Sequence, residues 1–192
     1  MRYVKILIFV FAFSSNLYSL TYFPPKVSDK GVFNIGAGGS VITDGSFEVL
    51  MTSEYSFSQS LSTILKLGYR DIKDEEKGWY GNIEQKILIA ERFGGTDYLS
   101  LTIGGHYCEI MGIDFSITLG NSFKNFDNYA GFDCEINFFD NNEIKYPAHF
   151  ILGVKLKPFS SQQGLIIEAG LPVTSFTSYQ FGILLQVNIF SL

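Results

Sequence analysis

Apolar and polar residues alternate strictly over residues 180–192, the last stretch of the chain. The odd-numbered positions are apolar: Phe181, Ile183, Leu185, Val187 and Ile189. The even-numbered positions are mostly polar or glycine: Gln180, Gly182, Leu184, Gln186 and Asn188. Successive side chains of a β-strand point to opposite faces of the sheet. The stretch is therefore predicted to be a strand with one apolar face and one mostly polar face.

The same alternation recurs in nine earlier segments, which gives ten predicted strands in all. The nine are residues 33–41, 47–57, 61–70, 79–92, 99–107, 113–120, 130–138, 149–157 and 165–173. The Asp44-Gly45 pair between the first two is a strong hairpin signal. Segments of about 9–11 residues suit tilted strands that cross a bilayer, and an even number is usual in bacterial barrels. Polar residues dominate the two longest connections, 71–78 and 140–147, which we expect on the outer side of the membrane.

The first residues have the pattern of an export signal. Arg2 and Lys5 precede an apolar block at residues 6–13, which is too short to span a bilayer as a helix. Residues 1–19 are therefore predicted to be a cleaved signal peptide, residues 20–31 a periplasmic leader, and residues 32–192 a single outer-membrane barrel domain.

The composition of the chain supports a membrane location for these strands. The chain is 46% hydrophobic and 16% aromatic, with a mean hydropathy of +0.17, yet it has no apolar run long enough for a membrane helix. An exported sheet with one apolar face must close on itself in lipid, since open edges would leave backbone groups unpaired. The predicted fold class is all-β: a transmembrane antiparallel up-and-down barrel of about ten strands. A soluble periplasmic barrel that carries a hydrophobic ligand is the structural alternative, but its apolar face would have to point inward.

The last strand resembles the C-terminal strand of bacterial outer-membrane β-barrels. The resemblance rests on Gln180, Gly182, Leu185 and Val187, and the chain departs from it by ending in Leu192 rather than an aromatic residue. It implies a bacterial outer-membrane location, contact with outer-membrane lipid, and recognition of residues 180–192 by the barrel assembly machinery. It names no particular activity.

If the apolar faces point outward, ionisable residues of both signs line the lumen. The acidic candidates are Glu48, Glu54, Glu84, Asp114, Asp133, Glu135 and Glu168; the others are Lys66, Arg70, Lys86, Arg92, Lys155, Lys157, His106 and His149. Because acidic and basic residues are nearly balanced, we expect them to form ion pairs that fill the lumen. Glycines fall on the same face, which leaves room for long neighbours to reach across.

Six apolar residues also point inward, in two groups. Leu50, Ile64 and Leu88 form the first, and Ile151, Ile166 and Leu184 form the second. They could line a site for a hydrophobic solute or pack together as a plug, and the plug is favoured.

Enzymatic chemistry has little support in the sequence, and no cofactor or metal is expected. There is no cluster with metal-ligand spacing and no Gly-x-Ser-x-Gly elbow. His149 follows Asp140 and Glu143, which is proximity in sequence only. A structural barrel or a narrow pore for a small solute is therefore the expected function. A barrel enzyme, protease-like or lipid-modifying, remains the alternative. The net charge of -5 argues against a nucleic-acid partner.

The two cysteines are predicted to remain thiols. Cys108 shares the parity of the inward residues and Cys134 that of the outward ones. Their strands are separated by a third, so their backbones lie about 9–10 Å apart, beyond the ~7 Å that a disulfide allows.

Overall fold

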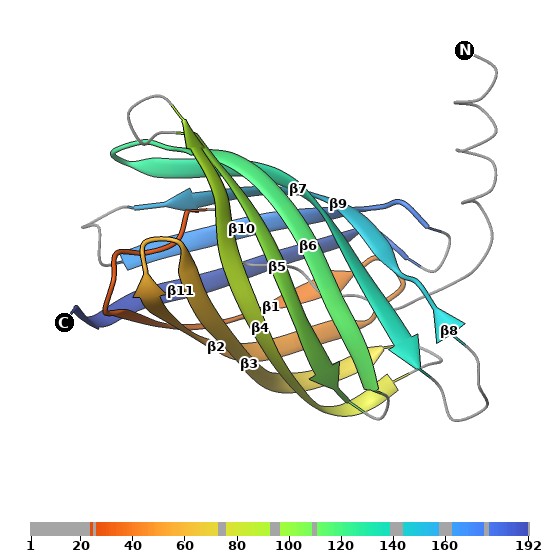
Figure 1. Ribbon diagram of the computed structural model, residues 1–192. Coiled ribbons are helices and arrows are strands. Elements are labelled where there is room, and N and C mark those ends of the chain that lie inside the picture. Colours follow the sequence, from red (N-terminus) through yellow and green to blue (C-terminus); the bar gives the residue numbers. More distant parts are fainter. Residues whose placement is uncertain are drawn as a thin grey trace, which may run out of the picture.

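Ten antiparallel strands close into a barrel in the computed structural model, which describes residues 24, 26–72, 76–92, 97–108, 111–138, 144–157, 163–174 and 177–191. The strands are β1 (Val32–Ile42), β2 (Phe47–Ser58), β3 (Leu61–Ile72), β4 (Glu76–Arg92), β5 (Asp97–Tyr107), β6 (Met111–Ser122), β7 (Phe126–Phe138), β9 (Ala148–Leu156), β10 (Gln163–Pro172) and β11 (Gln180–Ser191). A two-residue segment, β8 (Ile144–Lys145), pairs only with the end of β7. Each barrel strand pairs with the next in sequence, and β1 pairs with β11 to close the ring (Figure 1). The predicted fold, an all-β up-and-down barrel of ten strands, is confirmed.

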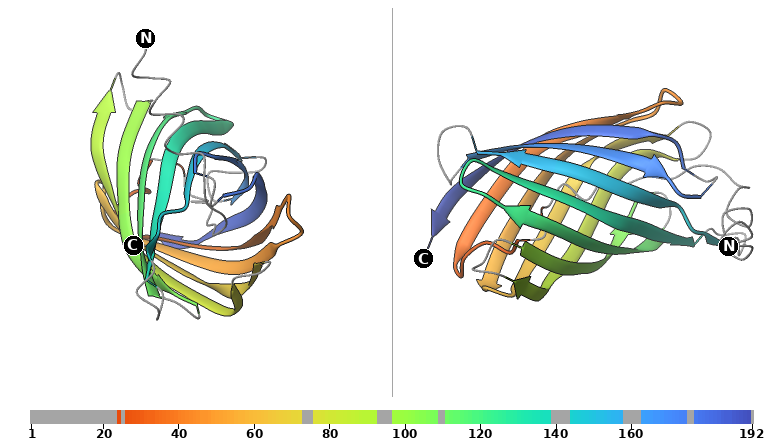
Figure 2. Two further views of the ribbon diagram at one scale, coloured as in Figure 1. Left: turned by 90° about the vertical axis from the view of Figure 1, so that its right-hand side faces the viewer. Right: turned by 90° about the horizontal axis from the view of Figure 1, so that it is seen from above.

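The strands run at a tilt around a central lumen, and the start of β1 and the end of β11 lie at the same rim (Figure 2). We call this the terminal rim and the other the opposite rim. Within the described residues, we find no helix with the length and hydrophobicity that crossing a membrane requires.

Side chains alternate between the outside and the lumen as the period-two pattern predicts. On β2 and β3 the outward residues Met51 and Leu67 are 66% and 54% exposed, while the inward residues Leu50 and Lys66 are 2% exposed. The outer face is thus mostly apolar, with exceptions such as Asn128, and most of the polar residues lie inside. This arrangement is the reverse of the one that a soluble carrier needs.

The connection between β3 and β4 is shorter than predicted. Residues 71–78 were expected to form a loop, but the two strands continue to pair as far as Ile72 and Glu76. Asp71 and Lys77 form an ion pair of 2.7 Å on this hairpin, and Lys77 is exposed. Cross-strand pairs of opposite charge stabilise such an extension, which a count of polar residues alone does not reveal.

A bulge in β4 interrupts the alternation. The register with β5 shifts between Leu88 and Ala90, so the parity counted from the start of the strand does not hold beyond Leu88. Past the bulge, the register partner of Arg92 on β5 is Asp97, which is not one of the inward positions of that strand. The side chain of Arg92 lies outside the described residues.

The described residues of the leader, 24 and 26–31, lie at the terminal rim, and several of them contact luminal side chains. The ammonium group of Lys86 donates to the carbonyl oxygen of Pro24 at 3.3 Å, and Asn34 donates to the hydroxyl of Ser28 at 3.0 Å. Val27 between them is only 4% exposed. The predicted signal peptide, residues 1–19, falls outside the described residues.

The two cysteines are separated as predicted. Cys108 follows β5 and is buried, Cys134 lies on β7 and is half-buried, and β6 runs between the two strands. In the described part of the chain both remain thiols, which confirms that prediction.

Candidate functional site

The candidate residues chosen from the sequence gather inside the barrel. Twelve of them are buried: Glu48, Glu54, Lys66, Arg70, Glu84, Lys86, His106, Asp114, Asp133, Glu135, His149 and Glu168. Lys155 and Lys157 are half-buried near the terminal rim. Neighbouring strands of a barrel place inward residues of similar depth side by side, so side chains distant in sequence come into contact.

Opposite charges in the lumen pair as the near-balance of charge predicts. Lys66 contacts Glu84 at 2.8 Å, on the neighbouring strand. Lys86 contacts Glu54 at 2.7 Å, although β3 lies between their strands. Ser62 on that intervening strand donates to the same carboxylate at 2.9 Å. Burying a charge is costly unless it is paired, and these contacts meet that condition.

Two luminal residues of β7 were missed by the sequence analysis. The alternation was read from Ala130, but β7 begins at Phe126 and carries Asp127 and Tyr129 inward. Asp127 accepts from Lys157 at 2.5 Å. Extending the parity of the strand backwards by four residues would have found both.

His106 and Asp114 form a hydrogen-bonded pair near the opposite rim. Nδ1 of His106 lies 2.8 Å from Oδ1 of Asp114, and Oδ2 of Asp114 accepts from the amide of Asn82 at 2.5 Å. The three residues come from three adjacent strands, so only the register brings them together. All three are buried, at 5%, 5% and 2% exposure.

Glu135 and Asn137 lie beside this pair on β7. One ligand atom from each of His106, Asp114 and Glu135 lies within 4.8 Å of the others. The Asn137 amide nitrogen is 3.5 Å from Oε2 of Glu135. We call these four residues, His106, Asp114, Glu135 and Asn137, the His106 cluster. A Cβ atom on Gly112 would collide with the imidazole ring and with Oδ1 of Asn137, so the glycine makes room for both side chains.

Arg70 and Tyr80 border the His106 cluster. Nε of Arg70 donates to Oε2 of Glu48 at 3.0 Å, and Nη2 forms an ion pair with the same oxygen at 3.0 Å and lies 4.0 Å from Oε1 of Glu135. Its Cζ atom lies 4.0 Å from the centre of the Tyr80 ring, and that ring is 5.9 Å from the imidazole of His106. The cation is therefore held by Glu48 and the tyrosine more closely than by the cluster.

The second histidine is not part of this cluster. Nε2 of His149 lies 3.3 Å from the carbonyl oxygen of Ser178. Asp140 and Glu143, which precede His149 in sequence, fall outside the described residues. The structure shows an acid–histidine contact between His106 and Asp114.

A single apolar cluster crosses the middle of the lumen, where two separate groups were expected. Its members are Leu50, Ile64, Tyr129, Ile151, Ile166 and Leu184. The side chain of Leu184 reaches over Gly36 on β1, where a Cβ would come within 2.9 Å of its Cδ2 atom. Leu88 is absent from the cluster because it lies at the β4 bulge and is only half-buried.

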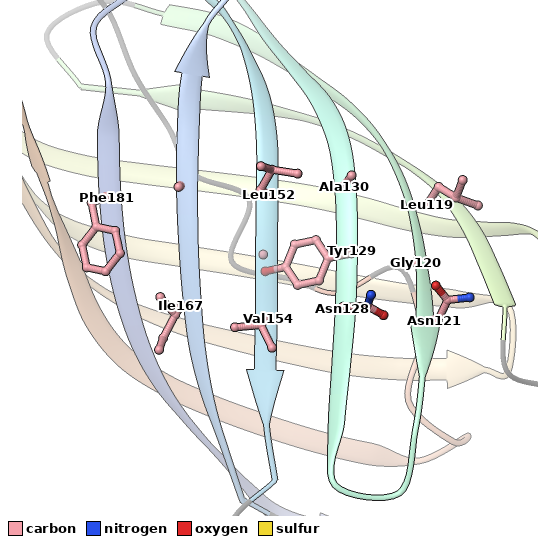
Figure 3. Close-up of a pocket in the computed structure, with 12 residues that line it drawn as sticks. Leu119, Gly120, Asn121, Asn128, Tyr129, Ala130, Leu152, Val154, Ile167 and Phe181 are labelled. Carbon is pink, nitrogen blue, oxygen red and sulfur yellow. The ribbon is translucent and has the colours of Figure 1, made fainter.

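Three hollows among the described residues contain no member of the His106 cluster. One of about 190 Å³ at the terminal rim is bordered by Lys26, Asp127, Lys155 and Lys157. One of about 590 Å³ lies along β1, β2 and β11. The third, of about 550 Å³, is a depression across β6, β7, β9, β10 and β11 (Figure 3). Leu119, Leu152, Val154, Ile167 and Phe181 border it, and most of its lining is the apolar outer face of the wall.

No family model and no curated protein matches the chain. Among solved structures it is similar to one described as a de novo designed transmembrane β-barrel, with 13% identity and a TM-score of 0.43 over 84% of this chain and 98% of the other. A loop-deletion mutant of OmpT, an outer-membrane protein of Vibrio cholerae, has 17% identity and a TM-score of 0.37 over 84% of this chain and 60% of its own. OmpT folded in vitro has 14% identity and a TM-score of 0.34, covering 95% and 73%. These values are low, so function is inferred below from this chain's own geometry.

Proposed function

We propose that this protein is an integral outer-membrane barrel with a closed lumen, a structural barrel rather than an open diffusion pore. The observation that carries the proposal is the apolar cluster in the lumen. Leu50, Ile64, Ile151, Ile166 and Leu184 are each at most 2% exposed. In a water-filled channel, side chains at this depth would be exposed to water.

The part of the lumen next to the apolar cluster is also filled. Lys66 on β3 and Glu84 on β4 pair at 2.8 Å, and Asp133 on β7 is 7% exposed. Charged side chains with so little exposed surface leave little room for a water-filled path. The apolar cluster and these charged residues together fill the lumen between the described strands.

The leader adds a second obstruction at the terminal rim. Its backbone accepts hydrogen bonds from Lys86, and the ammonium group of Lys26 lies 5.5 Å from the centre of the Tyr98 ring. A solute that entered through this rim would have to displace these contacts.

The outer face supports the proposed location. Residues such as Val49, Leu67 and Leu185 are more than half exposed on a wall with few charges, which suits lipid and not water. Residues 180–192 are the segment through which the assembly machinery would recognise the chain. In this orientation the terminal rim faces the periplasm, and the β3–β4 hairpin projects outside the cell.

A swelling assay on loaded liposomes tests the closed lumen. Vesicles that contain the wild-type protein should shrink and stay shrunken in sucrose or arabinose, as protein-free vesicles do. A double variant, Ile64→Gly with Leu184→Gly, removes two members of the apolar cluster and should admit the smaller solute if it folds. Uptake of arabinose by the wild type at the rate of an open porin would refute the proposal.

A further inference from the structure

We infer that the His106 cluster is a binding site for a single divalent transition-metal ion such as Zn²⁺. In this site Nε2 of His106, Oε1 of Glu135 and Oδ1 of Asn137 supply the ligands, and Asp114 orients the imidazole. The inference goes beyond the proposed function, because a closed structural barrel needs no metal.

The first observation is that the three ligand atoms lack hydrogen-bond partners among the described residues. Nε2 of His106 and Oδ1 of Asn137 have no hydrogen-bonding group in contact in this part of the chain, and Oε1 of Glu135 has only the Arg70 guanidinium at 4.0 Å, beyond hydrogen-bond distance. His106, Glu135 and Asn137 are 5%, 2% and 0% exposed. Buried polar atoms are almost always hydrogen-bonded, so three such atoms in one cluster indicate a missing ligand.

The second observation is the way in which His106 is held. Its Nδ1 atom is 2.8 Å from the carboxylate of Asp114, so this nitrogen is the one that donates, and in the neutral ring the lone pair lies on Nε2. Asn82 in turn donates to the same carboxylate at 2.5 Å. A carboxylate on one ring nitrogen and a metal on the other is the usual arrangement around metal-bound histidines.

Distances and charge agree with a metal ion. Nε2 of His106 and Oδ1 of Asn137 border the same small space, because a Cβ atom on Gly112 would contact both. One ligand atom from each of His106, Asp114 and Glu135 also lies within 4.8 Å of the others, and ligands around a tetrahedral zinc ion are about 3.3 Å apart. When Asp114 and Glu135 are both ionised, their two negative charges balance a divalent cation.

The ligand types select the class of ion. One imidazole nitrogen with a carboxylate and an amide oxygen suits Zn²⁺ and its neighbours in the first transition row, whereas Mg²⁺ and Ca²⁺ prefer oxygen ligands alone. Gly112 contributes by leaving space beside Nε2 and the Asn137 oxygen. The Arg70 guanidinium borders the site at 4.0 Å from Oε1 of Glu135 but contacts Glu48 more closely, at 3.0 Å.

Calorimetric titration of the untagged, full-length protein in detergent tests the inference. The protein is stripped with a chelator, titrated with Zn²⁺, and checked for folding by heat-modifiable migration. We expect one Zn²⁺ per chain, unaffected by excess Mg²⁺. His106→Ala and the isosteric Glu135→Gln should abolish this binding, and Asp114→Asn should weaken it about 10–100-fold.

His149→Ala is the matched control, since it removes the other buried histidine near the same rim and should keep full binding. If His106→Ala does not fold, the Zn²⁺ binding measured for Glu135→Gln decides the test. A wild-type protein that takes up no stoichiometric Zn²⁺ would mean that the cluster holds only water, and the inference would fail. It would fail equally if Glu135→Gln and His106→Ala bound Zn²⁺ as tightly as the wild type, or if His149→Ala lost it.

Discussion

Tyr129 on β7 donates a hydrogen bond of 2.6 Å to Glu168 on β10, across the intervening strand β9. Gly153 on β9 is the register partner of both residues, and its missing side chain leaves the space that the phenol ring occupies. The sequence predicts that luminal glycines leave room for long neighbouring side chains. In the structure, Tyr129 uses the space at Gly153 to reach Glu168.

Gly153→Ala should destabilise the barrel by about 1–3 kcal/mol, because the added Cβ would collide with three atoms of the Tyr129 ring. Urea titration in lipid vesicles, followed by the fluorescence of the single tryptophan Trp79, measures the change. Gly81→Ala is the control, since a Cβ there would meet only Leu67 at 3.7 Å. Equal losses for the two variants would contradict the role of Gly153.

Lys66→Met should cost about 3–5 kcal/mol, because it leaves the carboxylate of Glu84 buried without its nearest cation. The same urea titration provides the measurement. Lys77→Met removes the exposed partner of Asp71 on the hairpin and should leave the midpoint unchanged. A wild-type midpoint for Lys66→Met would show that the luminal ion pair does not support the wall.

Ile117→Arg should destabilise the folded state in a bilayer by about 2–4 kcal/mol. Ile117 lies on β6 opposite Leu101 of β5, at the middle of the apolar outer face, and is 38% exposed. Ile117→Leu keeps the face apolar and should have little effect. Equal stability of the arginine and leucine variants in vesicles would mean that this face does not meet lipid.

The two thiols should differ in their reactions. Cys134 is half-buried on the outward side of β7 and should react with an apolar maleimide dissolved in the bilayer. Cys108 is 2% exposed and should be reached only by small reagents. Mass spectrometry of the labelled peptides distinguishes the two. Preferential labelling of Cys108 by the apolar reagent would reverse the assignment of the two faces.

The sequence predicts the wall of the barrel well because the period of a strand is two and one face must be apolar throughout. The same rule identifies Leu50, Ile64, Ile151, Ile166 and Leu184 as inward residues. It fails beyond Leu88, where a bulge shifts the register, and at residues 71–78, where charged residues of opposite sign extend a hairpin.

Contacts within the lumen are harder to predict than the wall. The pairing of His106 with Asp114 depends on the register between β5 and β6, which places Gly104 opposite Asp114 and Gly112 opposite His106. Alternation alone says that both side chains point inward but not that they meet. The sequence therefore indicated the chemistry of the lumen without locating the His106 cluster in it.

Single-channel recording in a planar bilayer tests the closed lumen most directly. The wild-type protein is first shown to be folded by heat-modifiable migration and is then inserted into the bilayer. It should give no stable conductance steps beyond the current of a protein-free bilayer. The absence of conductance is expected because the apolar cluster and the Lys66–Glu84 pair fill the lumen. Regular open steps from most insertions of the wild-type protein would contradict the account.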